Sequence, residues 1–138
     1  MPARDRYHDH VKQALINDGW TITDDPLLLT IGEKVLFVDL GAQKLFAAEK
    51  AGRKIAVEIK SFISRSDVAD LELALGQYTL YLDILARTEP DRTLFLAISQ
   101  SVFKALFEAP IGLILLENQR LRLIVFDNEQ EQILQWIS

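Results

Sequence analysis

Two parts of the sequence combine apolar, strand-forming residues with charged residues that are suited to metal-dependent hydrolysis. Asp39 ends the apolar segment 34–39, and Glu58 and Lys60 lie within the segment 55–61. Side chains alternate between the two faces of a strand, so Glu58 and Lys60 are expected to share one face while the intervening apolar residues point to the other. If the two strands are neighbours, Asp39 adds a second carboxylate beside Glu58.

These residue types suit the hydrolysis of a phosphodiester. Mg²⁺, or Mn²⁺ in its place, is a hard cation that binds through few protein oxygens and keeps several waters. Such an ion can neutralise the phosphate and generate a nucleophilic hydroxide. We therefore predict a metal site at Asp39, Glu58 and Ile59, with Lys60 orienting the water and stabilising the developing charge. The alternative is that Glu58 and Lys60 form an ordinary same-face pair, which contributes at most about 1 kcal/mol, and that Asp39 is a turn residue before Gly41.

The arrangement resembles the PD-(D/E)xK nuclease superfamily, in which an aspartate on one strand and a Glu-x-Lys on the next, paired strand form the metal site. Asp39, Glu58 and Lys60 match these three positions. Val38 stands where the motif has proline, a substitution that the superfamily often shows. The resemblance implies a single restriction-endonuclease-like domain over residues 1–138.

The helix expected after this strand extends the resemblance. Its residues 77–81 read Gln-Tyr-Thr-Leu-Tyr, which fits a Gln-h-x-x-Tyr pattern seen in several branches of the superfamily. The resemblance implies that Gln77 and Tyr81 help to orient the active site or the DNA. At a spacing of four residues they share a helix face, and the alternative is that Tyr81 is simply packed with its hydroxyl hydrogen-bonded.

Short segments spread over nearly the whole chain also resemble the XisH family of cyanobacterial excision-controlling factors: residues 8–9, 18–20, 39–42, 47–50, 56–62 and 74–78. This resemblance implies association with the programmed excision of a DNA element that interrupts a nitrogen-fixation gene. It also implies two partners, a separate site-specific recombinase and a protein of the XisI type. Two functions remain open: a metal-dependent nuclease that acts on the DNA, and a non-catalytic accessory that docks the partner or the recombinase.

Periodicity and turn residues predict the elements that must position these side chains. Helices are expected over 5–18 and 68–86, the second capped by Ser66 or Asp67, with a short helix over 102–107. Strands are expected over 20–23, 34–39, 45–49, 54–61, 94–98, 112–116 and 121–126, with hairpin turns at 50–53 and 118–119. This order predicts an α/β (α+β) fold in which helices cover both faces of a mixed sheet.

The composition of the chain excludes several other kinds of site and disfavours several classes of protein. The chain of 138 residues has no cysteine, which excludes disulfides, thiolate zinc sites and cysteine nucleophiles. Its net charge of -5 argues against a protein that coats DNA through a basic surface. The longest apolar run, 109–116, is too short for a membrane span, and no secretory signal is evident, so we expect a cytoplasmic protein. A mean hydropathy of +0.11 favours a homo-oligomer that buries apolar surface between subunits.

Further metal ligands are harder to assign. His8 and His10 diverge on the first expected helix, which disfavours a histidine zinc site. His8 or Asp9 could approach the metal site from that helix, and Glu33 and Glu49 are similar candidates. The alternative for each is a solvated surface position.

Overall fold

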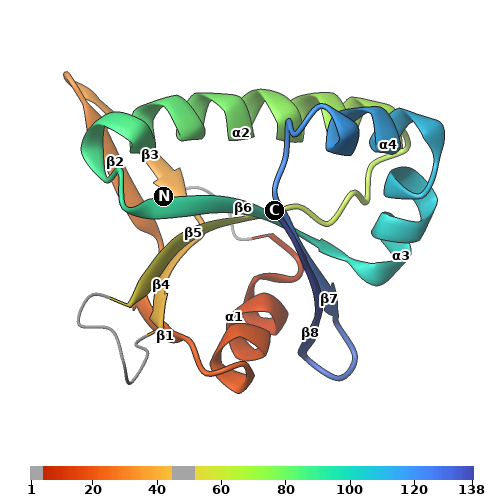
Figure 1. Cartoon of the computed structure of the whole chain (residues 1–138), viewed down its shortest axis with the longest axis horizontal. Helices are drawn as coiled ribbons and strands as arrows, with labels where there is room; N and C mark the ends of the chain where they lie inside the picture. The colour runs from red at the N-terminus through yellow and green to blue at the C-terminus, as the bar shows by residue number, and fades with distance from the viewer. Residues whose placement is uncertain (1–4, 45–51) are drawn as a thin grey trace.

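The computed structural model describes residues 5–44 and 52–138, and Figure 1 shows how its elements are arranged. Within these ranges the helices are α1 (His8–Asn17), α2 (Asp67–Thr88), α3 (Gln100–Val102), which runs into a π-helical turn (Phe103–Phe107), and α4 (Pro110–Glu117). The strands are β1 (Thr21–Asp24), β2 (Leu27–Ile31), β3 (Lys34–Val38), β4 (Leu40–Lys44), β5 (Arg53–Ile59), β6 (Arg92–Ser99), β7 (Leu123–Asp127) and β8 (Gln132–Ile137).

The main sheet has six strands in the order β1-β4-β5-β6-β7-β8. The three central strands β5, β6 and β7 are parallel, whereas β1, β4 and β8 pair antiparallel with their neighbours. Parallel neighbours need long crossover connections. α2 supplies the crossover from β5 to β6, and the segment from α3 to α4 supplies the one from β6 to β7.

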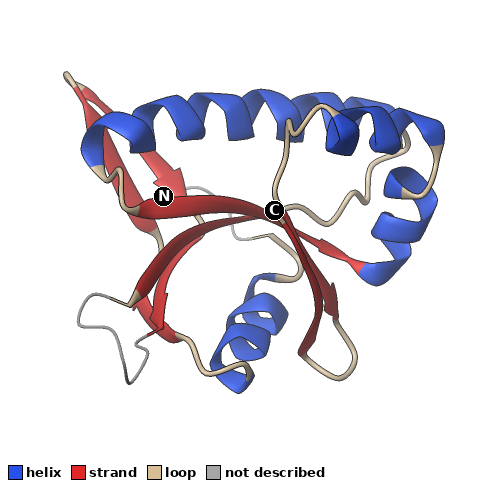
Figure 2. Cartoon of the chain, viewed as in Figure 1, coloured by secondary structure: helices blue, strands red, loops and turns tan. Residues whose placement is uncertain are grey.

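Helices cover both faces of this sheet (Figure 2). On one face Ala56 of β5 packs in a core cluster with Leu71 and Ala74 of α2. On the other face Val57 of β5 packs in a second cluster with Val11 of α1. The mixed sheet with helices on both sides confirms the fold class predicted from the sequence.

Residues 21–44 form one long hairpin that bends halfway. Its base, β1 and β4, belongs to the main sheet, and its outer half, β2 and β3, forms a separate two-stranded ladder. On the returning side the bend falls at Asp39, between β3 and β4. The outer half leaves the sheet and places Leu27 and Leu29 in the core cluster beneath α2. It is the orange arm at the upper left of Figure 1.

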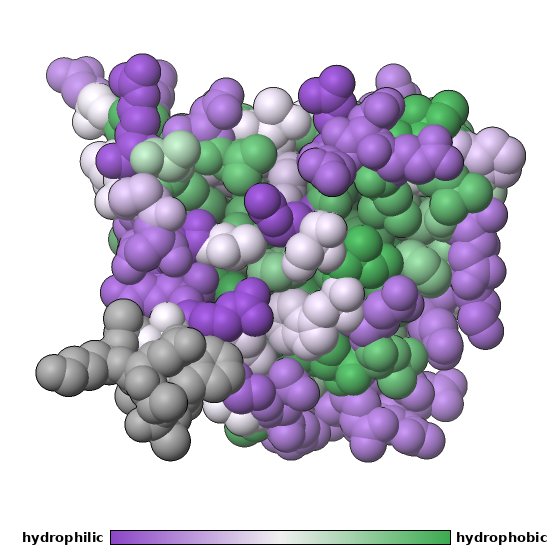
Figure 3. All heavy atoms as spheres, viewed as in Figure 1, coloured by the Kyte–Doolittle hydropathy of each residue, from purple (hydrophilic) through white to green (hydrophobic). Residues whose placement is uncertain are grey.

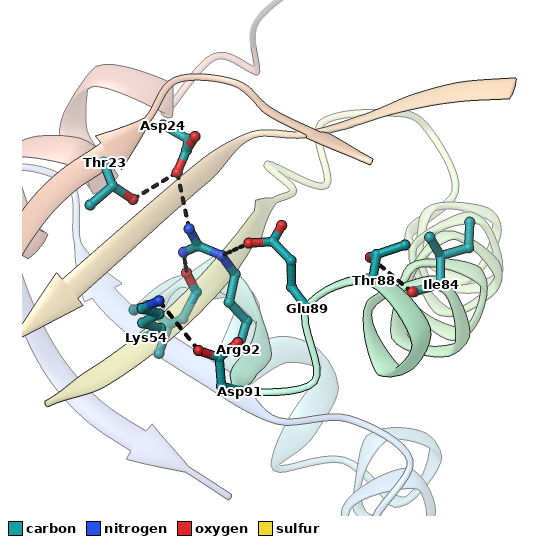
Figure 4. Close-up of polar contacts among 9 residues, drawn as sticks. Thr23, Asp24, Lys54, Ile84, Thr88, Glu89, Asp91 and Arg92 are labelled. Carbon is teal, nitrogen blue, oxygen red and sulfur yellow. Dashed lines mark hydrogen bonds and ion pairs between the residues drawn. The ribbon is translucent and has the colours of Figure 1, made fainter. Parts of the chain in front are cut away.

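Arg92, at the start of β6, links the strands β1 and β5 to the end of α2 (Figure 4). Its guanidinium donates hydrogen bonds to Asp24 of β1 at 3.1 Å, to Glu89 at the end of α2 at 2.9 Å, and to the backbone oxygen of Ile55 in β5 at 2.9 Å. Gly41 is needed beside this network, because a Cβ there would lie 2.8 Å from the Asp24 carboxylate. The network fixes the end of α2 relative to β5.

The segment after α3 differs from the sequence-based expectation. Residues 112–116 were expected to be a strand of a hairpin, but they belong to the helix α4, which begins with Pro110. Proline is favoured in the first turn of a helix, where its missing N–H is not needed. Gly112 lets α4 pack closely, since a Cβ there would lie 2.2 Å from the backbone oxygen of Leu106. The hairpin partner of β7 is instead β8, which the sequence did not reveal.

Hydrophobic atoms reach the surface at the upper right of Figure 3, over α4. Ile111, Leu113 and Ile114 are the exposed large residues of this helix. No helix in residues 5–44 and 52–138 is both long and apolar enough to cross a membrane.

Candidate active site

The predicted acidic residues meet where the bent hairpin leaves β5. β4 pairs antiparallel with β5, and Leu40 lies opposite Val57. One further step in this register places Asp39 opposite Glu58. The Asp39 carboxylate oxygen Oδ2 accepts a hydrogen bond of 2.7 Å from the backbone N–H of Ile59. This bond spans the gap between the two diverging strands and holds Asp39 beside Glu58.

The face on which Glu58 lies follows from strand alternation. Ile55, Val57 and Ile59 are all buried in the core cluster on the α1 side, whereas Ala56 is buried on the α2 side. Glu58 therefore points toward α2, and only 7% of its surface is exposed. The alternation predicted for the segment 55–61 is confirmed over residues 55–59, and β5 ends at Ile59, directly before Lys60.

α2 supplies the opposite wall of the site. Tyr81 is buried in the α2-side core, and its hydroxyl donates a hydrogen bond to the Glu58 carboxylate. Ser66 begins this helix by accepting a hydrogen bond from the backbone N–H of Ala69 at 3.1 Å, as an N-cap residue does. The predicted N-cap is therefore confirmed. The helix that begins there places Tyr81 on the face that packs against the sheet.

These side chains line a cavity of about 190 Å³. All five residues that the sequence singled out for catalysis border it, together with Ile59 and two residues that the sequence analysis did not select: Asp5, Phe37, Asp39, Glu58, Ile59, Lys60, Gln77 and Tyr81. Their proximity is a property of the structure, and their catalytic roles stay predictions.

The electrostatics of the cavity are governed by the neighbouring carboxyl groups of Asp39 and Glu58. Burial and the neighbouring Asp39 carboxylate together raise the pKa of Glu58 to about 10, and the hydrogen bond from Tyr81 partly opposes the rise. Burial and the same two carboxylates raise the pKa of Tyr81 to about 12. At neutral pH the Asp39–Glu58 pair therefore retains a proton in the absence of a metal ion. A divalent cation between the carboxylates would take the place of that proton.

The set of ligand atoms fits Mg²⁺ or Mn²⁺ better than zinc. Among the described residues no group of three or more His, Asp or Glu side chains is placed to hold one ion. Asp39 and Glu58 would supply two carboxylates, and the only ligand atom that Ile59 can offer is its backbone oxygen. A hard cation that keeps several waters needs no more than this.

Asp5 is the acidic residue that sequence reasoning missed. One of its carboxylate oxygens accepts a 3.0 Å hydrogen bond from the backbone N–H of Ser61, directly after Lys60. The other oxygen accepts a 2.9 Å hydrogen bond from the N–H of Tyr7, at the entrance to α1. Asp5 thus ties the first helix to the end of β5. An acidic residue just before a predicted helix is usually interpreted as its N-cap. No sequence pattern near Asp5 indicates a contact with β5.

The other acidic and histidine candidates do not border the cavity. His8 is buried, and its Nε2 lies 2.7 Å from an oxygen of Asp25. Neither Asp9 nor Glu33 is among the lining residues. Glu49, like the strand expected over 45–49, falls outside the described residues.

Comparison with known proteins identifies the family. Among curated proteins none matches. A solved XisH family protein from Nostoc punctiforme PCC 73102 is 36% identical, and the match covers 97% of this chain and 100% of that chain with a TM-score of 0.87. A solved fdxN element excision controlling factor protein from Anabaena variabilis is 42% identical, with 98% and 100% coverage and a TM-score of 0.84. The family model for the XisH protein matches residues 1–134. The chain belongs to the XisH family.

Proposed function

We propose that this protein acts on DNA during excision of a DNA element, as a Mg²⁺- or Mn²⁺-dependent phosphodiesterase of the PD-(D/E)xK type. The observation that carries the proposal is the pair formed by the buried Glu58 and the half-buried Asp39, which retains a proton without metal and lies in one cavity with Lys60. Membership of a family that includes an excision controlling factor supports the choice of DNA as substrate.

Each residue has a task in this proposal. Asp39 and Glu58 hold the cation, which when bound supplies charge neutralisation at the phosphate and an activated water. Lys60 is the cationic residue that lines the cavity, and its ammonium group orients the attacking water and offsets the negative charge of the transition state. Tyr81 keeps the Glu58 carboxylate in place by its hydrogen bond. Gln77, on the same helix, offers an amide to the phosphate or the water.

The test is nicking or cleavage of linear, supercoiled and branched DNA with Mg²⁺ or Mn²⁺. Wild type is compared with Asp39→Ala and Lys60→Ala. Lys54→Ala is the matched control, because Lys54 lies on β5, the strand directly before Lys60, but forms an ion pair of 3.3 Å with Asp91 outside the cavity. We expect cleavage by wild type and the control only. Equal activity in all four proteins, or none in any of them, would remove the catalytic assignment.

A second candidate is a non-catalytic accessory that directs excision by docking an XisI-type protein or the recombinase. It is favoured by the acidic second half of the chain, where residues 66–138 carry eleven acidic residues against five basic ones. A nuclease fold can serve such a role, because fold does not fix function. Co-purification with the partner and excision that both survive Glu58→Ala would favour this candidate.

A further inference from the structure

The longest helix, α2, is apolar on two faces, only one of which meets the rest of the chain. Its inner face is buried against the sheet and includes Leu71, Ala74, Tyr78, Tyr81, Ile84 and Leu85. A second row faces solvent and consists of Ala69, Leu73, Gly76 and Leu80, which we call the outer seam. Leu73 and Leu80 are 52% and 51% exposed. α2 runs along the top of the molecule in Figure 1.

The spacing within the outer seam is that of a helix–helix contact. Its members are four, three and four residues apart, which is the alternation that keeps a row of side chains facing one partner helix. A surface helix normally places polar residues on its solvent face. An apolar row there, at this spacing, indicates a second helix as the occupant.

Gly76 strengthens this interpretation. In a helix interior, glycine is less favourable than alanine by about 1 kcal/mol. Nothing in the described part of the chain requires it, because a Cβ at Gly76 would meet no atom there within 4 Å. A glycine in the middle of the seam is explained if another helix approaches closely at that point.

A second copy of α2, running antiparallel, complements the seam in both size and charge. In one register Leu73 lies opposite Gly76 of the second copy and Leu80 lies opposite Ala69, so that each large side chain meets a small one. The two-fold axis repeats both contacts. The same register brings Arg65, just before the helix, toward Asp83 of the second copy. Both residues are exposed, and neither has an ion-pair partner in the described part of the chain.

We propose that the protein forms a two-fold symmetric dimer through the outer seams of two antiparallel α2 helices. The seam and Tyr81 lie on different faces of α2, because a helix with 3.6 residues per turn places Tyr81 roughly 110° around the axis from the centre of the seam. Dimerisation would therefore stabilise the helix that borders the active-site cavity. The proposal does not depend on whether the cavity binds a metal or cleaves DNA.

Molecular mass in solution tests the proposal, measured by sedimentation equilibrium over a range of protein concentrations. We expect a dimer for wild type and a monomer for Leu73→Glu and Gly76→Leu. Gly76→Leu is the sharper variant, because in an isolated monomer it fills open space and improves helix propensity, so the chain should fold at least as stably. Leu134→Glu, at a 44% exposed leucine of β8, is the control and should remain dimeric. A monomeric wild type, or a dimeric Gly76→Leu variant, would overturn the proposal.

Cross-linking tests the register, and the absence of cysteine makes introduced thiols unique. Leu73→Cys protein mixed with Gly76→Cys protein should form a disulfide-linked dimer under mild oxidation. Leu134→Cys mixed with Gly76→Cys should not. If wild type is dimeric but only the second pair cross-links, the dimer uses another surface and the proposal is wrong.

Discussion

Replacing Glu58 by glutamine should stabilise the metal-free protein increasingly as the pH rises. The folded state holds Glu58 at a pKa of about 10, against an ordinary value of 4.5 in the unfolded chain. Between these values the folded state binds one more proton than the unfolded state, so its stability falls with rising pH. The loss is about 1.4 kcal/mol per pH unit, or on the order of 3 kcal/mol by pH 7. Glutamine has nearly the same shape and does not incur this loss.

The assay is urea unfolding with a chelator present, at pH 5, 7 and 8.5, for wild type and Glu58→Gln. The stability difference should be small at pH 5 and grow toward higher pH. Glu72→Gln, at an exposed position of α2, is the matched control and should show no such trend. A difference between wild type and Glu58→Gln that is constant with pH would refute the claim that burial and Asp39 keep Glu58 protonated.

Three other substitutions have defined outcomes. Gly41→Ala should destabilise the fold by about 1–3 kcal/mol in urea unfolding, because its Cβ would press on the Asp24 carboxylate. Tyr78→Phe should cost about 1–3 kcal/mol in the same assay, since the buried hydroxyl bonds two backbone groups at 3.1 Å each. Tyr81→Phe removes the hydrogen bond that lowers the pKa of Glu58. The pH at which Mn²⁺ binding reaches half its maximal affinity should therefore move upward, and an unchanged midpoint would contradict this.

The residues that line the cavity could be grouped from the sequence because the signals that single them out are local to each element. Glu58 and Lys60 are two residues apart at the end of β5, which stops at Ile59, and Gln77 and Tyr81 are four apart on α2, so periodicity alone predicts a common face for each pair. The meeting of Asp39 with Glu58 depends on strand pairing, and the resemblance to a known motif supplied that step.

Elements whose position depends on tertiary contacts were predicted less well. The apolar run 109–116 fits either a buried strand or a buried helix, and the contact of Gly112 with the preceding turn decides for α4. No local sequence pattern indicates the bend at Asp39, which divides one hairpin into two ladders. Asp5 was missed for the same reason, because its hydrogen bond to Ser61 joins segments far apart in the chain.

The measurement that tests the central claim most directly is a calorimetric titration of the protein with Mn²⁺ and Mg²⁺. It compares wild type with Asp39→Asn in buffers of different ionisation enthalpy. We expect wild type to bind with release of about one proton near neutral pH, because the cation displaces the proton held by Asp39 and Glu58. Asp39→Asn should bind at least about tenfold more weakly, as expected when a charged ligand is lost. Absence of binding at millimolar metal, or equal affinity in the two proteins, would contradict the existence of a metal site at these carboxylates.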